Sequence, residues 1–134
     1  MPHISRIKLD KKAERNLVEN LSLILTKIKK QDEMDSFLIS LLTSTERLML
    51  AKRIAIIILL KEDVPESHIA STLHVTRVTV SRLQFFWEAR GGGYDIALKV
   101  LENEKLMKEF KDGLLKLVAY SIRAAGGYVN PTIV

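Results

Sequence analysis

The chain has 134 residues, of which 47% are hydrophobic and none is cysteine, and its formal net charge is +5. This length and composition allow a buried core and argue against a disordered polypeptide, while the lack of cysteine excludes disulfides and thiolate metal sites and favours a reducing compartment. The first thirty residues are charged throughout and unlike a secretory signal, and the apolar run 54–60 is too short to span a bilayer. We therefore expect a cytoplasmic protein that has no membrane partner.

Positive charge is concentrated at the N-terminal end of the chain. Residues 1–30 hold eight Lys or Arg side chains and three Asp or Glu side chains, so this segment carries the whole net charge of +5. A basic segment on a neutral body suits contact with a polyanion such as nucleic acid. A solvated lysine-rich helix would give the same pattern, so charge alone leaves both interpretations open.

Apolar residues recur at helical spacing along the chain, and Pro and Gly divide it. In chain order we predict helices near residues 11–30, 37–42, 43–62, 66–73, 76–89, 96–101 and 106–123. Thr43 and Glu46 have the spacing of a capping box at the start of the third helix. The glycines at 91–93 are expected to break the chain, and the tail from Ala124 is expected to be loose. The predicted fold is all-α, with about six or seven helices.

The segment 54–60, IAIIILL, is apolar on every side of its predicted helix. A helix without a polar face has to be surrounded by other elements. A buried strand is the competing interpretation, because isoleucine is β-branched, but no other segment alternates as a partner strand would. Because a short chain has few helices to supply the cover, we expect a second subunit to provide it and the protein to be a homodimer.

Residues 68–83, HIASTLHVTRVTVSRL, have the pattern of a helix-turn-helix unit. Ala70 is small enough for the close crossing of two helices, and His74 stands at the turn, where glycine is more usual. Five apolar residues have the spacing needed to pack the two helices against the rest of the protein: Ile69, Leu73, Val75, Val80 and Leu83.

The second helix of this unit is rich in short polar side chains and arginine, which suit the floor of the DNA major groove, guanine edges and phosphates. The predicted DNA-binding residues are Thr76, Arg77, Val78, Thr79, Ser81 and Arg82. Helical scaffolds without a DNA role can share this spacing. We therefore predict a transcriptional repressor that binds double-stranded DNA sequence-specifically. The alternative is a helical protein-interaction module that keeps the helix-turn-helix fold without specific DNA binding.

Residues 41–82, LLTSTERLMLAKRIAIIILLKEDVPESHIASTLHVTRVTVSR, resemble the core of the tryptophan repressor superfamily. The glycines before Tyr94 are similar to those of an uncharacterised repressor-like branch of it. The resemblance implies an interlocked dimer in which each chain presents a helix-turn-helix to the major groove. It divides the chain into a repressor-like helical domain at 1–95, with the helix-turn-helix at 66–89, and a C-terminal helical extension with a loose tail at 96–134.

The resemblance also implies an effector site, because the family's corepressor-contacting positions correspond here to Thr43, Arg53 and Arg82. Leu83 and Phe86 stand where the family leaves room for the indole ring, and overfilling a packed cavity costs stability. We therefore predict no cofactor and DNA binding that is independent of the possible corepressor, L-tryptophan. If the site is closed, Arg53 is expected to form an ion pair with Glu46 or Glu88, or to cap a helix.

The remaining chemistry-bearing residues give no positive sign of catalysis or metal binding. His3, His68 and His74 lack the spacing of metal ligands, and the sequence has no nucleophile–base pair, glycine-rich phosphate loop or paired acidic site. Phe85, Phe86 and Trp87 are predicted to be core or dimer contacts rather than base-stacking groups. We predict that the protein is not an enzyme.

Overall fold

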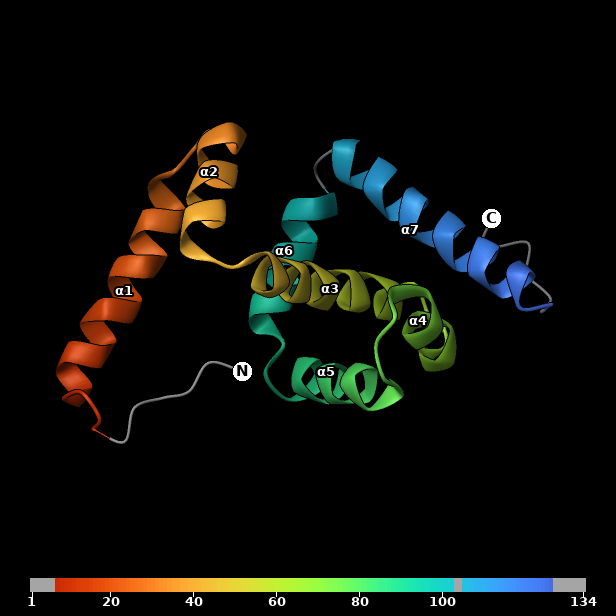
Figure 1. Cartoon of the computed structure of the whole chain (residues 1–134), viewed down its shortest axis with the longest axis horizontal. Helices are drawn as coiled ribbons and strands as arrows, with labels where there is room; N and C mark the ends of the chain where they lie inside the picture. Colours follow the sequence, from red (N-terminus) through yellow and green to blue (C-terminus); the bar gives the residue numbers. More distant parts are fainter. Residues whose placement is uncertain (1–6, 103–104, 127–134) are drawn as a thin grey trace. The chain divides into compact units, whose positions relative to one another are not determined.

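The computed structural model describes residues 7–102 and 105–126. Within these residues the fold is all-helical (Figure 1), which confirms the predicted class. The seven helices are α1 (Lys11–Lys27), α2 (Gln31–Leu41), α3 (Ser44–Lys61), α4 (Glu66–Leu73), α5 (Arg77–Arg90), α6 (Gly92–Glu102) and α7 (Lys105–Ala124). Most of the tail predicted to be loose lies outside the described residues. The chain forms two compact units, residues 1–47 and 48–134.

The first unit contains α1 and α2, and no residue of either helix is buried within the described chain. α1 nevertheless carries an apolar stripe whose members are all at least 40% exposed: Leu17, Val18, Leu21, Leu23 and Ile24. Arg47 closes the end of α2, where its Nη1 donates to the carbonyl oxygen of Leu42 at 2.9 Å. Because packing of an apolar face supplies most of a helix's stability in a protein, the stripe on α1 needs a cover.

The predicted capping box is present at the start of α3. The amide of Thr43 donates to Glu46 Oε2 at 2.8 Å, and the amide of Glu46 donates to Thr43 Oγ1 at 3.2 Å. The hydrogen bond from the Thr43 backbone, followed by that from its side chain, lowers the pKa of Glu46. The ionised carboxylate therefore stabilises this helix start above the ordinary glutamate pKa, and the contribution is lost as the pH falls through the lowered value.

The core of the second unit is built around the C-terminal half of α3, where Ala55–Leu59 are all buried. Side chains from α4, α5, α6 and α7 complete the core, among them Ile69, Val80, Leu83, Leu98 and Val118. The expectation that a second subunit has to cover this run is therefore wrong for residues 55–59. The four later helices of the same chain suffice, because each contributes one apolar face to the same cluster.

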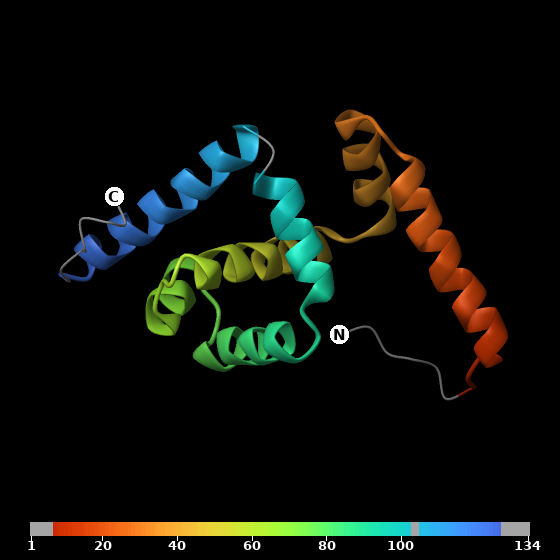
Figure 2. The ribbon, with the colours of Figure 1, turned by 180° about the vertical axis from the view of Figure 1, so that it is seen from behind.

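The helices of the second unit pack around α3. α4 contacts both α5 and α7, and α6 contacts both α5 and α7. Figure 2 shows α6 crossing α3. α7 is therefore joined to the helix-turn-helix through α4, so the C-terminal extension is part of the packed unit.

The glycines at 91–93 differ in what they do. Gly91 alone separates α5 from α6, and a Cβ atom added to it would lie 2.0 Å from the carbonyl oxygen of Trp87, so only glycine fits there. The prediction that all three glycines break the chain is wrong for Gly92 and Gly93, which form the start of α6.

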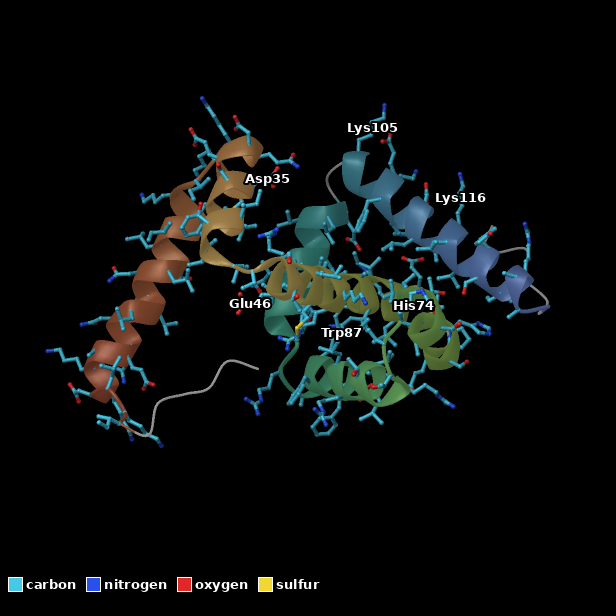
Figure 3. The ribbon with its side chains drawn as sticks, viewed as in Figure 1. Asp35, Glu46, His74, Trp87, Lys105 and Lys116 are labelled. Carbon is cyan, nitrogen blue, oxygen red and sulfur yellow. The ribbon has the colours of Figure 1, made fainter. Side chains whose placement is uncertain are left out.

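His74, which is labelled in Figure 3, ends α4. Its backbone is in the left-handed conformation, with φ 52° and ψ 52°. We expect His74→Gly to leave the free energy of unfolding within about 1 kcal/mol of the wild type, because glycine adopts this conformation freely but gains entropy in the unfolded chain. His74→Val should lower it by roughly 1–2 kcal/mol, since a β-branched residue is strained at positive φ. Chemical denaturation of both variants is the measurement, and equal effects would contradict the strain argument.

Candidate nucleic-acid interface

The predicted helix-turn-helix is formed by α4 and α5, and the turn between them is tight. The left-handed backbone at His74 allows the amide of Val75 to donate to the carbonyl oxygen of Ala70 at 3.0 Å. Ala70 is 7% exposed and Ile69 is fully buried, so the inner face of α4 is fixed in the core. The small side chain predicted for the helix crossing is thus in place.

Thr76 begins α5 as its N-cap. Its Oγ1 accepts from the amide of Thr79 at 3.2 Å and lies 2.9 Å from Thr79 Oγ1. A side-chain oxygen in this position satisfies one of the free amides at a helix start, which typically stabilises the helix by about 1 kcal/mol. Two of the predicted DNA-binding residues therefore also hold the helix start together.

The two faces of α5 differ sharply in exposure. Val80 and Leu83 are buried, and Val80 is 0% exposed. The residues predicted to bind DNA lie on the remaining surface and are all exposed: Thr76, Arg77, Val78, Thr79, Ser81 and Arg82. Val78 is 65% exposed although it is apolar. The sequence prediction thus selected a set of residues that shares the solvent side of one helix, with two guanidinium groups among short side chains.

One residue of this surface was missed by the sequence analysis. Ser81 Oγ donates to Glu66 Oε2 at 2.9 Å, so the first turn of α4 contributes a carboxylate beside the exposed face of α5. The two residues are fifteen positions apart, and in the sequence Glu66 looks like an ordinary acidic residue at a helix start. The helix-turn-helix pattern was the signal that could have predicted this contact, because the fold brings the start of α4 close to α5.

The aromatic residues at the end of α5 have different environments. Trp87 packs against the core and its Nε1 donates to Asp95 Oδ1 at 3.0 Å (Figure 3), which confirms a core contact. Phe85 and Phe86 are 65% and 42% exposed, so they are not core contacts of this chain, and the alternative that they are dimer contacts stays a prediction. They form an edge-to-face pair with ring centroids 6.1 Å apart, and the Arg90 guanidinium lies 5.9 Å from the Phe86 ring centroid. The helix turns these two rings away from the core because Leu83 and Trp87 occupy the inner face.

The candidate effector residues have different environments. Thr43 is engaged in the capping box of the first unit, and Arg53 and Arg82 are exposed on α3 and α5. Among the described residues, Arg53 forms no ion pair with either predicted partner, so the ion-pair part of that expectation is wrong. Glu46 accepts from Thr43 and Glu88 accepts from Gln84 instead.

A cavity of about 170 Å³ lies elsewhere, between α3, α6 and α7. Its apolar floor is formed by Ile58, Leu98 and Leu101, and charged side chains surround it. Lys61 pairs with Glu102, and Lys111 pairs with Glu62 at 2.8 Å. The hydrogen bond to Glu62 raises the pKa of Lys111, and that from Lys61 lowers the pKa of Glu102. None of Thr43, Arg53 and Arg82 lines this cavity, so it is separate from the predicted effector position.

The family model for the Trp repressor protein matches residues 16–102, which is more than half of the chain. The chain belongs to the Trp repressor family. The match runs from α1 to the end of α6, so it includes the whole helix-turn-helix and leaves α7 outside. Trp repressor proteins are DNA-binding regulators rather than enzymes. No curated protein matches this chain, and no solved structure matches it.

Membership confirms the recognised superfamily but not the uncharacterised branch that the glycines before Tyr94 resemble, which stays a prediction. Within residues 7–102 and 105–126, this Trp repressor family member has no helix that is both long and apolar enough to cross a membrane. The same residues contain no group of three or more His, Cys, Asp or Glu placed to hold a metal ion.

Proposed function

We propose that the protein is a sequence-specific, DNA-binding transcriptional repressor that acts as a homodimer in the cytoplasm and inserts α5 into the major groove. The observation that carries this proposal is the exposed face of α5. It combines two arginines with short polar side chains, while Val80 and Leu83 fix the opposite face in the core. A rigid helix with such a surface fits the groove and can contact base edges.

The residues of α5 divide into two roles. Arg77 is the first residue of the helix and Ser81 follows one turn later, so both lie where recognition helices contact bases. Val78, between them in sequence, offers an apolar surface for a thymine methyl group. The interface is completed by Thr76, Thr79 and Arg82. Thr76 and Thr79 form the cap at the start of α5, and Arg82 is proposed to contact phosphate.

We propose the domain division that the resemblance to the family implies. Residues 1–95 form the repressor-like domain with the helix-turn-helix at 66–89, and residues 96–134 form the extension. α7, which the family match leaves out, contacts α4 and so supports the first helix of the DNA-binding unit. The basic segment 1–30 is proposed to contact phosphates without reading sequence.

The second candidate function is a helical protein-interaction module, which the exposure of Phe85 and Phe86 favours. Salt dependence separates the two functions. Binding to duplex DNA through six or more phosphate contacts should weaken by about a thousandfold or more between 50 and 200 mM salt. Fluorescence anisotropy with a labelled duplex measures this. Failure to bind any duplex at 50 mM salt would favour the protein-interaction module.

We expect the protein to be a homodimer, with a mass twice that of the 15.2 kDa chain. The reason is the exposed apolar stripe on α1, which a second copy of the chain would cover, together with the interlocked arrangement that the family resemblance implies. Light scattering at micromolar concentration measures the mass. A folded monomer of 15.2 kDa would contradict the expectation.

L-tryptophan should bind weakly or not at all and should leave DNA affinity unchanged. Leu83 is only 8% exposed and already fills space in the core, and Arg53 and Arg82 are exposed rather than turned into a shared pocket. Calorimetric titration with L-tryptophan, paired with a DNA-binding assay with and without it, measures both properties. Micromolar affinity, or a tenfold gain in DNA binding, would show that an effector site opens beside α5.

A further inference from the structure

The hydrogen bond between Ser81 and Glu66 fixes the chemistry that Ser81 can offer to DNA. A carboxylate only accepts hydrogen bonds, so the proton on Ser81 Oγ is directed at Glu66 Oε2, 2.9 Å away. A hydroxyl has one donor and two acceptor lone pairs, so a serine whose proton is engaged can only accept from a further partner. By contrast, either hydroxyl of the Thr76–Thr79 pair could be the donor, so that pair imposes no direction.

We infer that Glu66 sets the base preference of α5 by holding the proton of Ser81, so that Ser81 reads an amino base, adenine or cytosine, on the strand it contacts. The inference rests on the proposed function. In the major groove adenine and cytosine present N6–H and N4–H donors, whereas guanine and thymine present only acceptors at the corresponding oxygens. An acceptor-only hydroxyl therefore pairs with the first two bases and meets lone pairs on the other two.

The pair is positioned before any DNA arrives. Glu66 lies in the first turn of α4, three residues before the fully buried Ile69, and Ser81 follows the fully buried Val80. The two helices are thus fixed to the same core on either side of the bond. Glu66 is also partly buried, and its negative charge is favourable at the N-terminus of α4. A hydroxyl held in this way does not have to reorient when a base approaches, so the preference is built into the free protein.

The test is selection of bound sequences from a random duplex library with the full chain, four single variants and one double variant, which combines Ser81→Ala with Glu66→Ala. Ser81→Ala removes the reading group, and Glu66→Ala releases its proton. Glu66→Gln keeps the side-chain size but can either accept from Ser81 or donate to it. Glu88→Gln is the matched control, because it removes one negative charge from α5 and leaves the Ser81–Glu66 bond intact. Circular dichroism melts establish that each variant is folded.

The wild type and Glu88→Gln should both select adenine or cytosine at one position of each half-site. Ser81→Ala should lose the preference at that position alone. Glu66→Ala and Glu66→Gln should relax it toward guanine and thymine, by roughly three- to tenfold in relative affinity, as expected for one hydrogen bond. In the Ser81→Ala background, Glu66→Ala should cause no further change in preference.

Two results would overturn the inference while leaving the proposed function intact. One is selection of guanine or thymine at the position that depends on Ser81. The other is an unchanged preference at that position in both Glu66 variants. If the wild type binds no duplex DNA, the proposed function fails and the inference fails with it, so the two failures are distinguishable.

Discussion

Replacing Ile57 with alanine should lower the free energy of unfolding by about 2–5 kcal/mol. Ile57 lies in the middle of the buried run of α3 and is 1% exposed. Helices on several sides pack against this run, so the surrounding side chains cannot collapse freely into the space that the lost methyl groups leave. Chemical denaturation followed by circular dichroism measures the change. The variant should also lose DNA affinity at temperatures where the wild type is folded, because α5 is anchored to the same core.

Ile96→Ala is the matched control, because it makes the same chemical change on α6 at a side chain that is 67% exposed. It should change the free energy of unfolding by no more than about 0.5 kcal/mol. If the two variants were equally destabilised, the core would not be centred on the buried half of α3. A loss at Ile57 below about 1 kcal/mol would lead to the same conclusion.

Arg77→Ala should weaken binding to a preferred duplex by about 1–3 kcal/mol, provided that the guanidinium takes a guanine edge. Arg77 is the first residue of α5 and its side chain is exposed, so we expect the substitution to leave the packed core intact. The same variant should weaken binding to unrelated duplexes far less. On those duplexes the arginine contributes only its electrostatic attraction to the phosphate backbone. Anisotropy titrations with both duplexes measure the two effects.

Two controls separate reading of sequence from general attraction. Lys116→Ala removes an exposed cation from α7 and should leave the preference for the selected duplex unchanged. Removal of residues 1–12 should weaken binding to all sequences alike, because this basic segment is proposed to contact phosphates only. An Arg77→Ala variant with an untouched sequence preference would show that Arg77 does not read a base.

The helices could be predicted from the sequence because their signals are local. The spacing of apolar residues predicts each helix, and the capping box at Thr43 and the cap at Thr76 mark two helix starts that the structure contains. The exposed face of α5 was predictable for the same reason. Val80 and Leu83 are three residues apart among polar residues, and this helical spacing predicts which side of α5 is buried.

What the sequence could not predict depends on distant contacts. The cover over residues 55–59 comes from four helices later in the chain, so the composition of α3 alone suggested a second subunit. The exposure of Phe85 and Phe86 follows from the rotation of α5 on the core, which residue type does not reveal. The bond between Glu66 and Ser81 needs the turn at His74 to bring two helix starts together. Each of these features is a consequence of packing rather than of local pattern.

The measurement that tests sequence-specific recognition by α5 most directly is the ratio of two dissociation constants at the same salt concentration. One is for the duplex selected from a random library, and the other is for a duplex of the same length and composition with its sequence scrambled. A dimeric repressor that reads bases through α5 should bind the selected duplex at least about a thousandfold more tightly. Equal dissociation constants for the two duplexes would contradict sequence-specific recognition by α5.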